Sequence, residues 1–226
     1  MTTSEYKVYP IKSSYGGFIN YSYIVIDAHT QEAAVIDPSW DLASILNILE
    51  AESAELTHIL LTHSHPDHVH LVQALLDRFD PKVYMGAAEI EFFNYQCANL
   101  HAVKDQDTIL LGSTLISCIH TPGHTPGSIC FSLKNCIFTG DTLFAEGCGI
   151  CSERGGDPAL MYHSLQTIRN RVHPSVHVYP AHSFGVEPGQ KLYLVLERNI
   201  YFNIFDEEQF VAFRMRKNQP DAKSFV

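Results

Sequence analysis

The stretch THSHPDH, residues 62–68, contains three histidines and one aspartate within its last six positions, directly after an apolar segment. The apolar residues before it predict a short buried strand, and Pro66 favours an extended conformation at His65, so that His63 and His65 can project together from the strand end. The last two residues of the stretch are expected to begin a helix. In a chain with 13 histidines, this pattern arises by chance in roughly 0.2% of cases. The motif therefore predicts a site for two metal ions.

Composition and charge narrow the class of protein. The chain has 226 residues, of which 46% are hydrophobic and 18% charged, and this composition suits one large domain spanning residues 1–226. A net charge of −10 argues against nucleic acid as a partner, because neutralising phosphates requires a basic face. The N-terminus has no secretory leader pattern, and no apolar stretch approaches the ~18 residues of a membrane span. We therefore expect a cytoplasmic protein without a membrane partner.

The six cysteines are interpreted as reduced thiols of the core. A chain of this size does not need disulfides to be stable, and several of the cysteines lie within apolar runs, which fits a reducing compartment. Cys148 and Cys151 form a CxxC motif, but no second CxxC accompanies it. A structural zinc or a redox role for this pair is therefore not favoured.

The apolar pattern alternates strands and helices and predicts one α/β unit. Strands are expected at 21–27, 33–37, 82–85, 108–119 with a turn at Gly112, 128–133, 136–139 and 176–179, and helices at 41–50, 69–79, 87–95, 158–171 and through most of the tail 190–216. The segment 13–18, with Gly16 and Gly17, is either a mobile flap over the site or a tight turn between strands. Strands in both halves of the chain predict two sheets packed on each other and covered outside by helices.

Three further polar residues lie where predicted strands stop. They are His124 in TPGHTPG, Asp141 in TGDT and His182 in PAHS. Each is flanked by small or rigid residues, which permit the tight turns of a site assembled from several strand ends. A lone loop histidine or aspartate is more often a surface residue. Beside the HxHxDH motif these three become candidate ligands, because three nitrogens complete one tetrahedral zinc while a second ion still lacks ligands.

The remaining histidines have no comparable context. We interpret His29, His58, His101, His163, His173 and His177 as structural or surface residues. His70 is either a partner that supports a ligand or a helix-surface residue, and the surface interpretation is favoured.

The order HxHxDH, TPGHTPGS, TGDTLF and a late histidine after a strand resembles the metallo-β-lactamase fold superfamily over about residues 6–184. The resemblance implies an αββα four-layer sandwich with the site at one edge of the two sheets. Residues 140–144 and 147–149, with Met161, Tyr162, Ser164 and Leu165, resemble the glyoxalase II type of thioester hydrolase. It also implies two Zn²⁺ per chain, with Fe or Mn as other possibilities. By this resemblance one ion is held by His63, His65 and His124, the other by Asp67, His68 and His182, and Asp141 bridges the two.

Such a centre suits hydrolysis of an activated carbonyl. Two divalent ions lower the pKa of a shared water from 15.7 to near ~7 and stabilise the oxyanion that forms on attack. Asp67 is the candidate catalytic residue, because it can orient the hydroxide and take up its proton. A thiolate, with a conjugate-acid pKa near ~8.5, leaves without a dedicated acid, and no such acid stands out in the sequence.

The substrate expectation comes from differences from glyoxalase II. His70-Leu71, Ile150, Ser183-Phe184 and a tail of about 40 residues after His182 depart from the glyoxalase II pattern for glutathione thioesters. The segments 147–157 and 6–23 instead resemble the zinc-dependent hydrolases encoded in trans-acyltransferase polyketide synthase clusters. That resemblance implies hydrolysis of acyl thioesters on acyl carrier proteins during antibiotic biosynthesis, with the carrier or its acyl-phosphopantetheine arm as the partner.

Four alternatives stay open. They are a glyoxalase II-like hydrolase of acyl-glutathione, a lactonase or β-lactam hydrolase, an iron-dependent persulfide dioxygenase, and a carrier-binding module without catalysis. Arg214, Arg216 and Lys217, with Arg198 and Lys223, form a candidate docking patch for the carrier, for which a solvated helix face is the competing interpretation.

Overall fold

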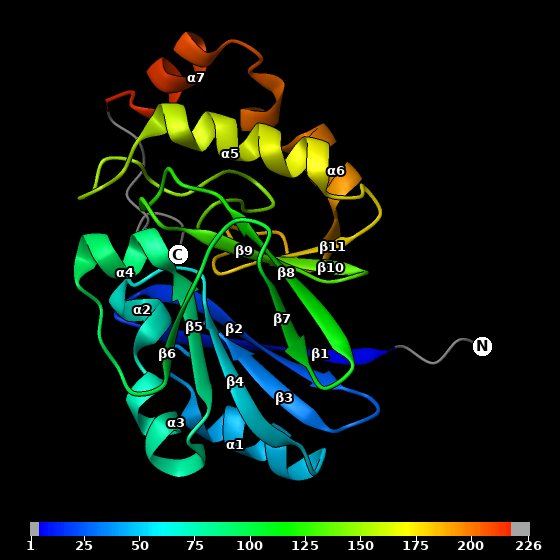
Figure 1. Ribbon diagram of the computed structural model, residues 1–226. Helices are drawn as coiled ribbons and strands as arrows, with labels where there is room; N and C mark the ends of the chain where they lie inside the picture. The colour runs from blue at the N-terminus through cyan, green and yellow to red at the C-terminus, as the bar shows by residue number, and fades with distance from the viewer. Residues whose placement is uncertain (1–4, 218–226) are drawn as a thin grey trace.

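Two six-stranded β-sheets pack face to face in the computed structural model, which describes residues 5–217, and helices cover their outer faces (Figure 1). In spatial order the first sheet contains β1 (Tyr6–Tyr15), β2 (Phe18–Asp27), β3 (Glu32–Ile36), β4 (Glu55–Leu61), β5 (Lys82–Gly86) and β6 (Leu100–Val103). The second contains β12 (Gln190–Lys191), β11 (His177–Pro180), β10 (Cys136–Gly140), β9 (Ile129–Ser132), β8 (Thr114–His120) and β7 (Thr108–Leu111). The expected αββα sandwich is confirmed.

The helices divide between the two outer faces. The first sheet is covered by α1 (Leu42–Ala51) and α3 (Val72–Phe79), and the second by α5 (Pro158–Arg171), α6 (Leu192–Arg198), the 3-10 turn η1 (Ile200–Asn203) and α7 (Glu207–Arg214) (Figure 1). The short helices are α2 (Pro66–Val69) and α4 (Ala87–Phe93). Buried apolar clusters fill the space between the sheets and the space under each helical layer. These clusters supply the hydrophobic stabilisation of the fold.

Three local predictions differ from the structure or are decided by it. The single helix expected at 69–79 is divided, because the Leu71 N–H donates to the Pro38 carbonyl (3.0 Å) where the chain turns between α2 and α3. Strands β1, β6 and β12 were not predicted. In β6 only Val103 of the four residues is buried, so its apolar pattern is weak. The tight-turn interpretation of Gly16 and Gly17 is confirmed: both have positive φ in the turn that joins β1 to β2.

The loops that follow β4, β8, β10 and β11 meet at one edge of the sandwich. The Ile129 N–H donates to the Thr62 carbonyl across the two sheets (2.9 Å). The Ala181 N–H donates to the Gly140 carbonyl (3.1 Å), and the Ala181 carbonyl accepts from the Tyr21 N–H (2.8 Å). These bonds fix the positions of three strand ends that carry predicted site residues.

Two further features of the chain are the state of its cysteine thiols and the length of its helices. All six cysteines are free, and burial raises the pKa of the Cys151 thiol to about 11. Among the described residues, no helix combines the length and the apolar character needed to cross a bilayer.

Asp27, at the end of β2, connects the two sheets through hydrogen bonds to Ser113 and Thr114. It lies at the opposite edge of the sandwich from the loops that carry the predicted site residues. Its fully buried carboxylate accepts hydrogen bonds from the hydroxyls of Thr114 (2.7 Å) and Ser113 (2.8 Å) and from the Thr30 N–H (2.8 Å). Burial raises the pKa of Asp27, but these hydrogen bonds outweigh the burial and hold the pKa well below its usual value.

The Asp27→Asn variant is expected to be less stable by about 2–3 kcal/mol at pH 7, because one carboxylate oxygen is replaced by a donor that faces other donors. A carboxyl whose pKa is depressed in the folded state stabilises the fold above its unfolded pKa of about 4, and this contribution is lost as the pH falls below that value. Urea unfolding of both proteins at pH 7 and near pH 3 checks this expectation. A stability difference that does not shrink at the lower pH would contradict it.

Candidate metal centre

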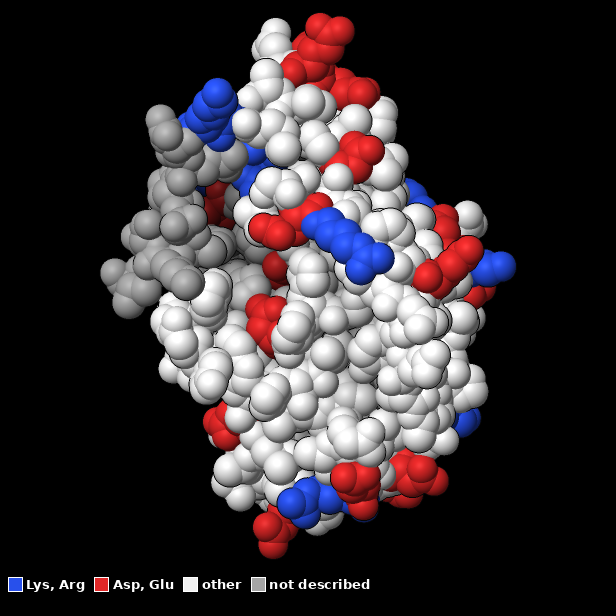
Figure 2. All heavy atoms as spheres, turned by 90° about the vertical axis from the view of Figure 1, so that its left-hand side faces the viewer, with Lys and Arg blue, Asp and Glu red and all other residues white. Residues whose placement is uncertain are grey.

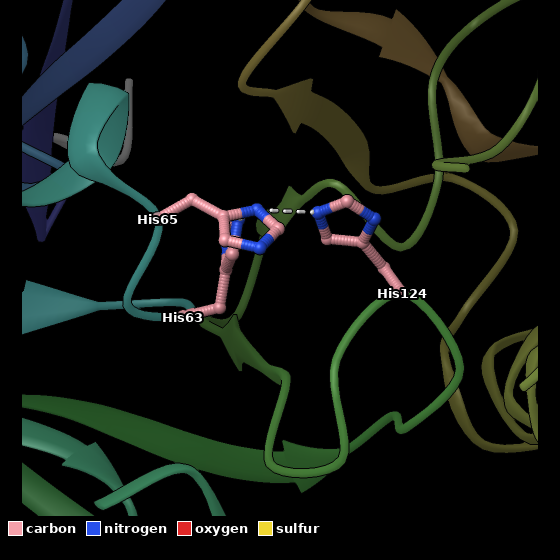
Figure 3. Close-up of side chains that lie close together, drawn as sticks. All are labelled: His63, His65 and His124. Atoms are coloured by element: carbon pink, nitrogen blue, oxygen red, sulfur yellow. Dashed lines mark hydrogen bonds between the residues drawn. The ribbon is translucent and has the colours of Figure 1, made fainter. Parts of the chain in front are cut away.

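Three histidine side chains converge from two loops (Figure 3). His63 and His65 follow β4, and His124 lies between β8 and β9. The His65 Nδ1 atom is 3.1 Å from His63 Nε2 and 3.0 Å from His124 Nε2. A tetrahedral zinc with Zn–N bonds of about 2.0–2.1 Å separates its nitrogens by about 3.3–3.4 Å. The three nitrogens therefore have the spacing of a zinc ligand set.

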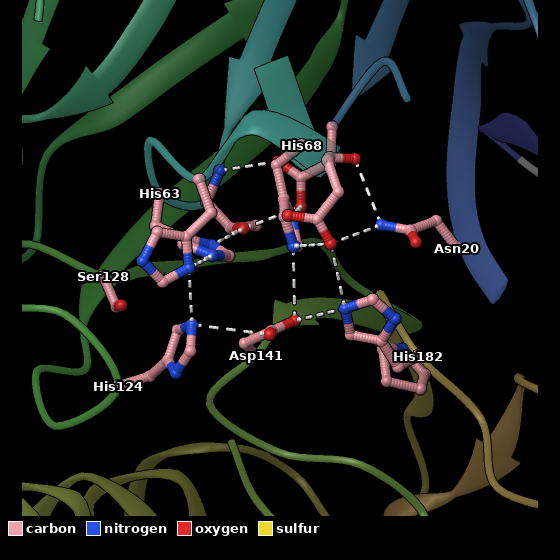
Figure 4. A network of polar contacts seen from close by, with 12 residues as sticks. Asn20, His63, His68, His124, Ser128, Asp141 and His182 are labelled. Atoms are coloured by element: carbon pink, nitrogen blue, oxygen red, sulfur yellow. Dashed lines mark hydrogen bonds and ion pairs between the residues drawn. The ribbon is translucent and has the colours of Figure 1, made fainter. Parts of the chain in front are cut away.

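A second group contains Asp67, His68 and His182. Figure 4 shows His68 and His182 beside His63 and His124 of the first group. The Asp67 Oδ2 atom is 3.4 Å from His182 Nε2 and 3.7 Å from His68 Nε2. His65 has the extended conformation expected before Pro66, and α2 begins at that proline. This local geometry turns the residues after His65 into a helix, which brings the His68 ring to 3.9 Å from the His63 ring, centroid to centroid.

Asp141, at the end of β10, lies between the two groups (Figure 4). Its Oδ2 atom is 3.4 Å from His124 Nε2, and its Oδ1 atom is 3.4 Å from both His68 Nε2 and His182 Nε2. Both Asp141 Oδ1 and His68 Nε2 are buried without a hydrogen bond among the described residues. Buried polar atoms are nearly always hydrogen-bonded, so two unsatisfied atoms that face each other are compatible with an ion or a water between them. The nitrogen and carboxylate donors fit zinc.

The outer ring nitrogens of the candidate ligands are held by hydrogen bonds. His124 Nδ1 donates to the Ile150 carbonyl (2.7 Å), and His182 Nδ1 donates to the Ile19 carbonyl (2.8 Å). His68 Nδ1 lies 3.0 Å from Asp37 Oδ2. A carbonyl acceptor fixes the proton on Nδ1, which leaves the Nε2 lone pair directed into the centre. The tautomers of His124 and His182 are thus set by backbone carbonyls, and that of His68 by the Asp37 carboxylate.

The electrostatics of the two groups differ in the absence of metal. Burial lowers the pKa of His63 and of His124, which favours the neutral imidazole that a metal requires. Burial also lowers the pKa of His68, but the carboxylates of Asp141 and Asp37 outweigh it and raise the pKa to about 9. The pKa of His182 is raised for a similar reason, chiefly by Asp141. A cation bound to this second group would replace the protons of His68 and His182, which otherwise balance the negative charge of the neighbouring carboxylates.

Three residues that support the candidate ligands were not found from the sequence. Asn20 Nδ2 donates to Asp67 Oδ2 (3.0 Å), and Asp37 Oδ2 accepts from the Thr62 hydroxyl (2.7 Å). The Glu89 carboxylate accepts a hydrogen bond from the N–H of Ser64, which lies between His63 and His65. The only sequence signal was for Asp37, which follows the apolar run of β3 as other site residues follow their strands.

The residues set aside from the site are mostly where they were expected. His70 is exposed, which confirms the surface interpretation, and His58 is buried away from the centre, beside Thr57. None of the other described histidines belongs to the three potential metal groups.

The predicted docking patch is partly wrong. Arg214 is only 5% exposed, so its guanidinium is not available to a carrier protein. Arg216 and Lys217 are exposed, and Lys223 lies outside the described residues. Figure 2 shows the lysine and arginine side chains of one face scattered among acidic ones, without a continuous basic area.

Arg214 instead contacts the loop beside the candidate centre. Its Nε donates to the Gly149 carbonyl (2.9 Å) and its Nη1 to the Tyr201 hydroxyl (3.0 Å). The Gly149 N–H donates to the Asp141 carbonyl (2.9 Å). A Cβ at Gly149 would lie 2.1 Å from that carbonyl oxygen, so the loop passes too close for any side chain.

The Arg214→Ala variant is expected to lose about 3 kcal/mol or more of unfolding free energy, because two hydrogen bonds from a buried charged donor are removed. Urea unfolding of metal-free protein measures the loss. Arg198→Ala is the matched control, because this arginine is exposed at the end of α6, and the change should alter stability by less than about 0.5 kcal/mol. Equal losses in the two variants would contradict the structural role of Arg214.

Comparison with known proteins identifies the family. The family model described as the metallo-beta-lactamase superfamily matches residues 15–182. The chain belongs to this superfamily. A crystal structure of a metallo-beta-lactamase from Staphylococcus aureus subsp. aureus COL shares the fold, with a TM-score of 0.84 at 23% identity over 96% of this chain and 68% of that one.

Two curated relatives are similar over nearly their full length. The chain is 48% identical over 214 residues to the probable polyketide biosynthesis zinc-dependent hydrolase PksB of Bacillus subtilis, with 95% of each chain covered. It is 46% identical, with the same coverage, to the probable polyketide biosynthesis zinc-dependent hydrolase BaeB of Bacillus velezensis. With the family match, these relatives make the protein a metal-dependent hydrolase.

Proposed function

We propose that the protein uses two zinc ions to hydrolyse acyl thioesters carried by an acyl carrier protein in polyketide biosynthesis. The observation that carries the proposal is the position of Asp141 between two ligand groups, with its two oxygens directed to opposite sides. The names of the two Bacillus relatives support the zinc ions and the pathway. One ion would be held by His63, His65, His124 and Asp141, and the other by Asp67, His68, His182 and Asp141.

The chain's own residues would orient and deprotonate the attacking water. Bound zinc ions supply a Lewis acid for the thioester carbonyl and make a water acidic enough to ionise near neutral pH. Burial raises the pKa of Asp67, but the hydrogen bond from His182 and the charge of His68 hold it well below its usual value, so the group is a carboxylate at neutral pH. Asn20 fixes this carboxylate from the β2 side. Asp67 then orients the water and accepts its proton.

A thioester suits this arrangement better than an amide. Expulsion of a thiolate, whose conjugate acid has a pKa of about 8.5, requires no proton donor, whereas an amide nitrogen must be protonated before it leaves. Aromatic side chains stand beside both ligand groups: the Phe93 ring is 6.3 Å from the His65 ring and the Phe144 ring is 5.8 Å from the His182 ring, centroid to centroid. The Phe93 ring, which is partly exposed, offers an apolar surface to the acyl chain of a substrate.

The test compares one acyl group on three thiols: acyl carrier protein, coenzyme A and glutathione. We expect kcat/KM for the carrier-bound substrate to exceed that for acyl-glutathione by at least about tenfold, an effect of ~1.4 kcal/mol. An equal or greater value for glutathione would overturn the carrier assignment. Hydrolysis of a lactone or a β-lactam with no thioester activity would overturn the reaction class.

A further inference from the structure

Glu89 of α4 holds a buried carboxylate that the proposed chemistry does not use. Its side chain is fully buried, with 0% exposure. The Oε1 atom accepts from the Ser64 N–H (2.9 Å) and the Ser64 hydroxyl (2.7 Å), and the Oε2 atom accepts from the Gly127 N–H (3.1 Å). Three donors offset the cost of burying this charge.

The two residues that donate to Glu89 lie on the two loops of one ligand group. Ser64 stands between His63 and His65, and Gly127 is three residues after His124. One carboxylate therefore connects the whole of the first group. The second group depends on other contacts, which are those of Asn20, Asp37 and the Ile19 carbonyl.

The backbone packing around Glu89 leaves its carboxylate little freedom. A Cβ at Gly127 would lie 1.9 Å from the Glu89 backbone nitrogen, and one at Gly86 would lie 2.1 Å from the Gly127 carbonyl oxygen. The start of α4 and the loop after His124 are thus in direct backbone contact. The backbone contact fixes the loop after His124 relative to α4. The hydrogen bonds from Ser64 to the Glu89 carboxylate fix the loop after β4 relative to the same helix.

We propose that Glu89 is a positioning residue that holds the group of His63, His65 and His124 in zinc-binding geometry while leaving the second group unaffected. The inference rests on the two-ion centre of the proposed function. Glu89→Gln keeps the shape of the side chain but replaces one acceptor oxygen with an NH₂ group. This group would face the N–H of either Ser64 or Gly127, so the loop that carries that residue must move. Partners that orient metal ligands typically change metal affinity by about 10- to 100-fold.

The test measures zinc affinity directly, by competition with a chelator, in Glu89→Gln and Glu89→Ala. We expect one of two ions to bind about 10- to 100-fold more weakly and the other to be unchanged. Two single-site backgrounds identify the ion: in His182→Ala the Glu89→Gln change should weaken the remaining ion, and in His124→Ala it should have no effect. Equal weakening of both ions, or of neither, would overturn the proposal.

Asp27→Asn is the matched control for general destabilisation. Asp27 is also a fully buried carboxylate that accepts from a serine N–H and hydroxyl, and it is remote from the centre. The unfolding temperature of the metal-free protein and both zinc affinities are measured for Asp27→Asn and Glu89→Gln. We expect a similar drop in unfolding temperature in both variants but unchanged zinc affinities in Asp27→Asn, which shows that Glu89 acts through the position of the ligands. A wild-type chain that binds no zinc would instead refute the proposed function.

Discussion

The Asp67→Asn variant should hydrolyse thioesters with a kcat about 10²- to 10⁴-fold below that of the wild type, the range for loss of a positioned proton acceptor. Asparagine has the shape of aspartate and an oxygen for a cation, but it cannot take up a proton from the attacking water. The hydrogen bond from Asn20 Nδ2 to Asp67 Oδ2 is compatible with an amide oxygen at the same position. The loss should therefore appear in kcat more than in KM.

Steady-state kinetics together with the zinc content of the same sample separate catalysis from metal binding. Asp77→Asn, on the exposed face of α3, is the matched control and should leave kcat unchanged. If Asp67→Asn retains two zinc ions and loses less than about tenfold in kcat, Asp67 is not the proton acceptor.

The Asp141→Ala variant should be affected more broadly, because this residue faces both groups. His124, His68 and His182 each have a ring nitrogen 3.4 Å from an Asp141 oxygen. Removing the carboxylate leaves two separate sets of three ligands without the charge between them. We expect both ions to bind more weakly and thioester hydrolysis to fall by at least about 10³-fold.

Calorimetric titration with zinc measures this effect on each ion. The matched comparison is His124→Ala, which removes a ligand from one group alone and should weaken chiefly one ion. An Asp141→Ala protein that binds two ions with unchanged affinities would show that the carboxylate does not lie between them.

The fold and the candidate ligands could be predicted because their signals are local. The histidines of residues 62–68 lie close together in the sequence, in one loop and the short helix that follows it. His124, Asp141 and His182 each follow an apolar strand in a short turn. The division of the helix at 69–79 could not be predicted in the same way. It depends on a hydrogen bond to Pro38, more than 30 residues earlier in the chain.

The supporting residues escaped prediction because their contacts join distant parts of the chain. Glu89 lies in a helical pattern in which a charged residue is usually solvated, and nothing nearby in the sequence shows that its partners are Ser64 and Gly127. Arg214 was expected at the surface for the same reason, since charge alone does not reveal that the last residue of α7 is buried. Burial of a charged side chain is a property of tertiary packing.

The metal content of the purified protein tests the central claim most directly. Elemental analysis of protein expressed in medium containing zinc and iron, followed by dialysis, measures the ions that remain bound per chain. Two zinc ions per chain, both lost with thioester hydrolysis on chelation and both restored with it, is the result that two ligand groups joined by Asp141 predict. A single iron ion per chain, with full activity, would contradict it.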